Sequence, residues 1–268
     1  MTPSHMRISL LTDKTQRSVH WQQCSRKAFL AALCALFLPF SACAWNAAGH
    51  RLVASIAWDH LNSDVRTEAS RLLRAHPDYE RWRKRAGKND VDRSVFIAAS
   101  TWPRDIIKDP RFYTAGSEPA KPRLPGFPDM DRHTSWHYVI RPFNASLSEL
   151  PTSGQIDKQL KIQAKILGDS ERALYERSYA LPWLIHMVGD AHQPLHVSVR
   201  LNAAGKWDKL GNGLTVNNPF NLQKPKTTLH AFWDDLPGPS SLRGVQLDAV
   251  TRVLLSTIPN PPRANSSD

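Results

Sequence analysis

Apolar residues recur at helical spacing along most of the chain from Trp45 onward. Helices are predicted where positions three or four apart are both apolar, and the marking residues are Leu52 and Ile56, then Val91, Val95, Phe96 and Ala99, then Ile156, Leu160, Ile166 and Leu167. The third of these helices should end at Gly168, because glycine is the preferred residue just past a helix C-terminus.

A further helix is predicted between Ser170 and Asp190. Ser170 is a suitable N-cap, and Pro182 should either kink this helix or begin a new one, because proline has no backbone N–H. Proline- and glycine-rich stretches predict long loops at 109–132 and 202–228, and the only candidates for short strands are 138–140 and 214–216. The pattern therefore predicts an all-α fold, a single mostly helical domain with long loops.

The first 44 residues have the pattern of a secretory leader. Arg26 and Lys27 precede an apolar run at 28–40, which is too short to span a membrane, and Ala42-Cys43-Ala44 matches the small-x-small cleavage pattern. Cleavage would fall just before Trp45, so we expect a secreted or periplasmic protein without stable membrane insertion. Lipidation of Cys43 is a second, lower-ranked interpretation.

Composition restricts the chemistry of the part that follows the leader. All three cysteines (Cys24, Cys34 and Cys43) lie in the leader, so the mature chain would have neither a disulfide nor a thiolate ligand. The whole chain has a net charge of +11, which favours polyanionic partners such as nucleic acid or anionic lipid.

Histidine and aspartate are concentrated in two segments near the C-terminal end. His186 and Asp190 are four residues apart, as are His230 and Asp234, so each pair would share a helix face. Pro194 would end the first helix and return His196 toward that face. Imidazole nitrogen and carboxylate oxygen are zinc ligands at about 2.0–2.2 Å. One such pair is commonly a surface hydrogen bond, but two pairs among apolar residues favour a metal site.

These segments resemble the zinc-dependent single-strand nuclease family, of the nuclease S-one/nuclease P-one type, which is related to bacterial zinc phospholipases C. The resemblance begins with Trp45-Asn46-Ala47-Ala48-Gly49-His50 and continues through Ala99-Ser100-Thr101-Trp102-Pro103-Arg104-Asp105, Trp136-His137-Tyr138 and the two histidine-aspartate segments. The matched positions occur in order from Trp45 to about Asp235.

The resemblance implies three zinc ions and nine ligand residues. It assigns Asp105, His137, His186 and Asp190 to the first ion, and His196, His230 and Asp234 to the second. The third ion would be held by the amino group and carbonyl oxygen of Trp45, by His50 and by a bridging Asp190. The amino group of Trp45 is free only after leader cleavage, so processing would complete the site.

The resemblance also implies a reaction, and separately we expect the protein to be a monomer. Single-stranded DNA and RNA would be hydrolysed to 5′-phosphorylated nucleotides, with 3′-nucleotidase activity as an additional expectation. Asp105 would orient the attacking water, and Lys108 would lie near the phosphate. Tyr138 could stack a base or could equally be a core aromatic, and Asn212 either lies near the site or forms a tight turn.

Other polar residues are assigned away from the ligand set. His192 would support a ligand without binding metal, His60, His76 and His133 are expected on the surface, and Asp235 has the wrong spacing from His230.

The sequence also departs from the family pattern. Ile140 stands where base-recognising members have aspartate, and only 34 residues follow Asp234, so the nuclease domain at 45–268 is expected to be truncated at its C-terminal end. The alternatives are a zinc phospholipase C and a catalytically impaired zinc-binding protein.

Overall fold

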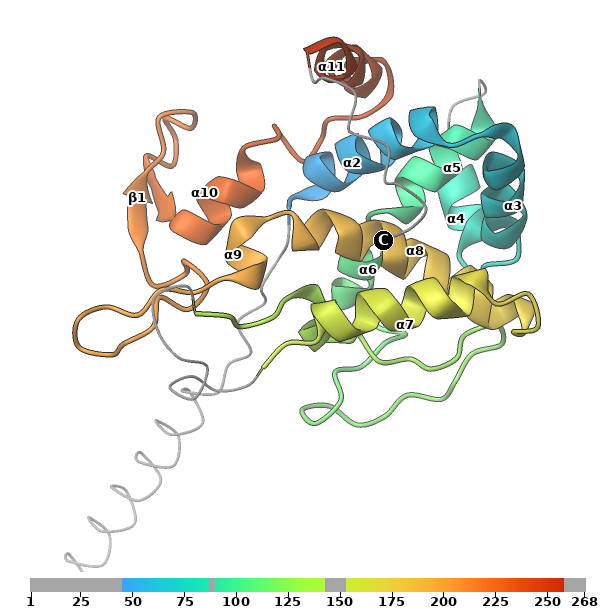
Figure 1. Cartoon of the computed structure of the whole chain (residues 1–268), viewed down its shortest axis with the longest axis horizontal. Helices are drawn as coiled ribbons and strands as arrows, with labels where there is room; N and C mark the ends of the chain where they lie inside the picture. The colour runs from blue at the N-terminus through green and yellow to red at the C-terminus, as the bar shows by residue number, and fades with distance from the viewer. Residues whose placement is uncertain (1–44, 87–89, 143–152, 258–268) are drawn as a thin grey trace, which may run out of the picture. The chain divides into compact units, whose positions relative to one another are not determined.

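The computed structural model describes residues 45–86, 90–142 and 153–257, and within them the fold is a mostly helical single domain, as predicted. The leader assigned to residues 1–44 lies outside these ranges. The elements, in chain order, are α2 (Ala47–His60), α3 (Ser63–Arg74), α4 (Tyr79–Arg83), α5 (Val91–Ala99), α6 (Trp102–Asp105), η2 (Ile106–Lys108), η3 (Thr134–His137), α7 (Ile156–Gly168), α8 (Leu174–Ala191), α9 (Pro194–Val197), β1 (Thr215–Asn217), β2 (Lys226–Thr228), α10 (Leu229–Asp235) and α11 (Gly244–Thr257) (Figure 1).

Helix α8 is the element around which the others pack. It contacts α2, α3, α6, α7, α9 and η3. Its fully buried residues Trp183, His186, Met187 and Asp190 are three or four positions apart and share one face of the helix, whereas Val188 is 39% exposed. This face therefore points into the interior of the domain.

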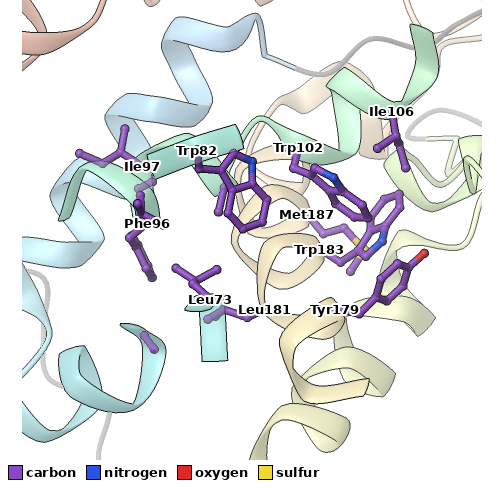
Figure 2. Close-up of a cluster of buried hydrophobic side chains, with 14 of the residues drawn as sticks. Leu73, Trp82, Phe96, Ile97, Trp102, Ile106, Tyr179, Leu181, Trp183 and Met187 are labelled. Atoms are coloured by element: carbon purple, nitrogen blue, oxygen red, sulfur yellow. The ribbon is translucent and has the colours of Figure 1, made fainter. Parts of the chain in front are cut away.

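Aromatic side chains form the core on one side of α8 (Figure 2). The ring of Trp102 from α6 packs edge-on against Trp183 and Tyr179 of α8, with centroids 6.0 Å and 5.5 Å apart. The indole Nε1 of Trp102 donates to Asp78 at 2.8 Å, so this buried polar atom keeps a partner. The packing fixes α6, and with it Asp105, against α8.

Side-chain caps start several of the helices. Asn46 accepts from the Ala48 amide at 2.8 Å at the start of α2, and Asn62 accepts from Val65 at the start of α3. Helix α5 is capped by Asp90, which accepts from Arg93 and has φ of 46°. These caps satisfy backbone N–H groups that have no partner within the helix.

The predicted start of α8 was wrong, and of the two outcomes predicted for Pro182 a new helix is excluded. The helix begins at Leu174, not near Ser170, because Glu176 reaches back to accept from the Ala173 amide at 3.3 Å. Pro182 causes neither a break nor a new helix. Leu181, Pro182 and Trp183 are all buried, and this burial offsets a proline cost of about 3 kcal/mol.

The two strand predictions had different outcomes. Segment 138–140 forms no strand and contributes a single bridge between Val139 and Gly154. The expected strand at 214–216 is present but shifted by one residue, and it pairs with β2 in an antiparallel hairpin where Val216 faces Thr227. The hairpin lies in the predicted loop at 202–228 and leads directly into α10.

The surface prediction was confirmed for His60, was wrong for His76 and held only in part for His133. His76 is only 2% exposed and stacks on Trp82, while its Nδ1 accepts from the Asp78 amide at 3.0 Å. His133 stacks on Trp136 and lies between Asp129 and Asp131. Aromatic residues distant in sequence also cover both rings, Trp102 and Phe127 for His76 and Trp183 for His133, and local sequence gives no sign of them.

Within the described residues, no helix combines the length and the apolar character that crossing a bilayer requires.

The packing of α3 predicts a large effect of Leu73→Ala. Leu73 is fully buried, so removing its side chain should lower the free energy of unfolding by about 2–5 kcal/mol, measured by urea denaturation. Val65→Ala on the same helix is the control, because Val65 is 46% exposed and its loss should change stability by less than about 0.5 kcal/mol. Equal effects of the two variants would contradict the described core.

Buried His76 predicts a loss of stability in mild acid. Burial lowers the pKa of His76 from 6.5 to about 3, so the folded state excludes a proton that the unfolded state binds below pH 6.5. The free energy of unfolding is therefore unaffected by this proton above pH 6.5, and it decreases as the pH falls from 6.5 toward 3. His76→Asn should make the free energy of unfolding less pH-dependent by about 2 kcal/mol between pH 6.5 and 5. If the free energies of unfolding of the wild type and His76→Asn changed equally with pH in metal-free buffer, a neutral, buried His76 would be contradicted.

Candidate metal centre

Four predicted ligands meet at the C-terminal half of α8. Asp190 lies between the imidazoles of His50 from α2, His137 from η3 and His186 one turn earlier on α8. The Asp190 Oδ1 atom is 3.2 Å from His50 Nε2, and Oδ2 is 2.9 Å from His137 Nδ1 and 3.3 Å from His186 Nε2. We call these four residues the α8 cluster.

Several donor atoms of the α8 cluster are buried without a hydrogen-bond partner. Both ring nitrogens of His50, Nε2 of His137 and Oδ1 of Asp190 are in this state, although His50 Nε2 and Asp190 Oδ1 are close. The rings of His50 and His186 stack with centroids 3.8 Å apart. Buried polar atoms without partners are costly, and a bound cation is one way to satisfy them.

The protonation of the α8 cluster suits metal binding. Burial and the neighbouring His186 lower the pKa of His50 to about 3, and burial lowers that of His137, so both rings are neutral at pH 7. Burial would raise the pKa of Asp190, but its three histidine neighbours hold it well below the ordinary range. Neutral imidazoles and an ionised carboxylate are the forms that bind metal.

A second group, the α10 cluster, consists of His196 from α9 with His230 and Asp234 from α10. One ligand atom from each residue lies within 4.8 Å of the other two, and all three residues are buried. His230 Nε2 is 3.6 Å from Asp234 Oδ2, as the four-residue spacing predicts. Burial raises the pKa of Asp234 to about 8 in the absence of a cation, while a hydrogen bond from Gln193 lowers it.

Backbone carbonyls orient three of the imidazoles. The Nδ1 atom pairs with Ser100 O in His186, with His137 O in His196 and with Leu210 O in His230, at 2.6–2.7 Å. A carbonyl can only accept, so each Nδ1 carries the proton and each Nε2 keeps its lone pair. This arrangement is typical of metal-binding histidines.

The two clusters belong to one centre. His196 of the α10 cluster bonds to the carbonyl of His137 in the α8 cluster, and the charge of Asp190 contributes to the raised pKa of Asp234. The start of α2 is fixed to the same place, because the amide of Asn46 donates to Asp234 O at 3.0 Å. Trp45 therefore lies beside α10, and its Cβ is near Gly49.

Asp105 and Lys108 are adjacent to this centre but belong to neither cluster. Asp105 ends α6, is exposed, and accepts from Thr101 at 3.4 Å. Partial desolvation raises its pKa, whereas the charges of Arg85, Arg51 and Arg104 lower it. Lys108 is exposed at the end of η2. The ligand role of Asp105 and the phosphate role of Lys108 remain predictions.

The predicted substrate contacts are positioned by local structure. Tyr138 is half-buried, its hydroxyl lies 2.8 Å from Ser153 Oγ, and its ring packs on a small cluster that includes Ile140. Asn212 donates from Nδ2 to Lys209 O within a tight turn. The structure gives His192 no contact with a proposed ligand within the described residues, since this side chain is exposed and bonds to Val188 O. Asp235 accepts from Asn46.

Three residues that shape the centre were not found from the sequence. Gln193 is fully buried and donates to Asp234 Oδ1 at 2.8 Å. Gly189 leaves space for His50, because a Cβ there would lie 3.0 Å from His50 Nδ1. The charge of Arg104 acts on both His137 and Asp234. The only signal in the sequence was position, since Gly189 and Arg104 directly precede Asp190 and Asp105, and Gln193 lies between Asp190 and His196.

These features define a helical protein with a buried centre of imidazole and carboxylate groups that could hold metal ions. A family model described as S1/P1 Nuclease matches residues 45–259, and the chain belongs to this family. A search of curated proteins found no match. Membership establishes a nuclease, a hydrolase that acts on nucleic acid, and it agrees with the resemblance found in the sequence.

The contact at Gly189 predicts weaker metal binding by Gly189→Ala. The added methyl group would displace the His50 ring by a few tenths of an ångström, so zinc affinity in calorimetric titration should fall by about tenfold or more. Gly168→Ala in α7 is the control, because nothing lies within 4 Å of its added Cβ. If Gly189→Ala had unchanged zinc affinity, His50 would not be a ligand of the metal centre.

Proposed function

We propose that this chain is a secreted, zinc-dependent endonuclease that hydrolyses single-stranded DNA and RNA to 5′-phosphorylated nucleotides, with 3′-nucleotidase activity as a second reaction. The observation that carries the proposal is the pair of adjoining buried clusters of imidazole and carboxylate groups, together with the atoms of the α8 cluster that have no hydrogen-bond partner. Membership of the S1/P1 Nuclease family supplies the reaction class.

The donor set favours zinc over harder cations. The α8 cluster offers three imidazoles and one carboxylate, and the α10 cluster offers two imidazoles and one carboxylate. Magnesium and calcium prefer oxygen ligands, whereas zinc accepts imidazole nitrogen together with carboxylate oxygen. When bound, zinc ions would promote ionisation of water near neutral pH and stabilise negative charge on the phosphate.

In this proposal the chain holds three ions. The first is bound by His137, His186, Asp190 and Asp105, and the second by the α10 cluster. The contact between Ser100 O and His186 keeps the segment that contains Asp105 beside the α8 cluster, which supports its inclusion. The third ion is bound by His50, Asp190 and the freed amino group and carbonyl of Trp45. Leader removal before Trp45 is therefore part of the proposal, as is location outside the cytoplasm.

The side chains around the clusters would position the substrate. Attack of water on phosphorus breaks the P–O3′ bond, leaving a 5′-phosphate on one product and a 3′-hydroxyl on the other. Asp105 accepts a hydrogen bond from the attacking water and orients it toward phosphorus. Lys108 and Arg104 supply positive charge near the phosphate, and Arg104 already acts electrostatically on both clusters.

Preference for single strands would follow from stacking on an aromatic ring. Tyr138 directly follows the ligand His137, and the contact of its hydroxyl with Ser153 limits rotation of its ring. A half-buried aromatic ring can stack an unpaired base, whereas bases within a duplex are already stacked. Ile140 has an aliphatic side chain and is buried, so this position supplies no carboxylate for base recognition.

The α10 cluster gives a direct test of this function. Asp234→Asn removes a proposed zinc ligand, and cleavage of single-stranded DNA should fall by at least about 100-fold, with loss of bound zinc by elemental analysis. Asp235→Asn, one residue away, should retain activity within about threefold, because Asp235 belongs to neither cluster and its side chain accepts from Asn46. A chelator should abolish the activity of the wild type, and double-stranded DNA should be cut more slowly.

Other outcomes would replace the proposal. Equal activity of Asp234→Asn and wild type would remove the α10 cluster from catalysis. Release of phosphocholine from phosphatidylcholine without cleavage of DNA would indicate a zinc phospholipase C. Zinc binding without hydrolysis of either substrate would indicate a zinc-binding protein.

A further inference from the structure

Two cavities lie next to the metal centre and share Trp82 and Arg85 as lining residues. The first, of about 360 Å³, is formed by α4, α6 and η2, and it includes Arg104, Asp105 and Lys108. The second, of about 330 Å³, lies between α2, α5 and the start of α11, and its basic lining residues are Arg51, Arg85, Arg93 and Arg243. Helices α2 and α11 are in direct contact (Figure 1).

Three of these arginines form no salt bridge within the described part of the chain. Arg93 pairs with Asp248 at 2.7 Å, so its charge is neutralised. By contrast, Arg51 donates only to the carbonyls of Ser240 and Leu242, at 2.9 Å and 3.1 Å. Arg85 and Arg243 are exposed at the cavity rim. We call Arg51, Arg85 and Arg243 the arginine cluster.

The members of the arginine cluster are close enough to repel one another. Burial lowers the pKa of Arg51, and the charges of Arg243 and then Arg85 lower it further, opposed by Asp105. Arginine remains protonated despite such shifts, so three positive charges coexist around one cavity. An anion that entered this cavity would remove the repulsion and gain charge-assisted hydrogen bonds from the guanidinium groups.

The arginine cluster is continuous with the metal centre. Arg85 lines both cavities, and Arg104 lines the first cavity together with Asp105 and Lys108. Basic side chains therefore follow a path from the edge of the metal centre at Asp105 to the second cavity. A strand with its scissile phosphate at the metal centre would carry its next phosphates along this path.

We propose that Arg51, Arg85 and Arg243 form a subsite that binds a backbone phosphate of single-stranded nucleic acid, away from the phosphate that is cleaved. The identity of the strand as substrate rests on the proposed function. Guanidinium groups bind phosphate oxygens in a fork and do not read bases, so the subsite adds affinity for long substrates without sequence preference.

The subsite can be tested in the full chain with Arg85→Ala/Arg243→Ala, since both side chains are exposed. The matched control is Arg83→Ala/Arg252→Ala, which removes the same charge from α4 and α11 outside both cavities. Affinity for a fluorescein-labelled dT12 oligonucleotide is measured by anisotropy in a chelator across a salt series. Hydrolysis of bis(p-nitrophenyl) phosphate, a diester with a single phosphate, is measured with zinc.

The cavity variant should bind dT12 about tenfold more weakly than the wild type at ~0.1 M salt. The slope of log affinity against log salt concentration should decrease by about 0.7 for each phosphate that the variant no longer binds. Hydrolysis of the small diester should be unchanged, and the control variant should match the wild type in both assays.

Equal weakening in the cavity and control variants, or no weakening in either, would overturn the subsite. Binding of anionic phospholipid vesicles through these arginines, with no binding of dT12, would overturn it in favour of a lipid surface. Failure of the proposed function would give a different result, because the wild type with zinc would then hydrolyse neither bis(p-nitrophenyl) phosphate nor single-stranded DNA. The anisotropy comparison would still decide whether the arginines bind a strand.

Discussion

The constraint on which the rest of the structure depends is the burial of Asp190 among three imidazoles. An ionised carboxylate in a protein interior is costly unless cations or hydrogen-bond donors surround it. The three rings come from separate parts of the chain, since His50 lies on α2, His137 on η3 and His186 on α8. Bringing them to one carboxylate requires α8 to be central and α2 and η3 to lie against it.

The surrounding core holds this arrangement in place. Trp183 and Met187 are fully buried on α8, and Trp183 packs on Trp102 and on the ring of His137. One helix therefore supplies proposed ligand residues and core residues, all of them fully buried. The buried network of Trp102, Asp78 and Arg111 fixes α6 and η2 in turn, which positions Asp105 and Lys108 at the edge of the centre.

The sequence predicted those parts of the site that follow from local spacing. Residues four apart share a helix face, so the pairs His186 with Asp190 and His230 with Asp234 could be identified directly. Their meeting with His50 and His137, far along the chain, was predicted only through the family resemblance. The clusters confirm that proximity, while Asp105 stays outside them, and the number of metal ions remains a proposal.

What the sequence could not predict depends on contacts between distant segments. His76 was expected on the surface, but Trp82, Trp102 and Phe127 enclose it. Gln193 gains its role only because α10 places Asp234 within hydrogen-bonding distance of its amide. The start of α8 was misplaced because Glu176, and not Ser170, satisfies the first backbone amide. In each case the deciding partner is set by tertiary packing or by a competing side chain, and not by hydrophobic period.

The most direct test of the central claim is anomalous diffraction at the zinc absorption edge from crystals of the processed protein. The account predicts zinc peaks within about 2.0–2.2 Å of ligand atoms in both the α8 cluster and the α10 cluster. It further predicts a third peak beside the amino group of Trp45. Absence of zinc from both clusters in an active enzyme would contradict the account, because catalysis would then occur elsewhere in the molecule.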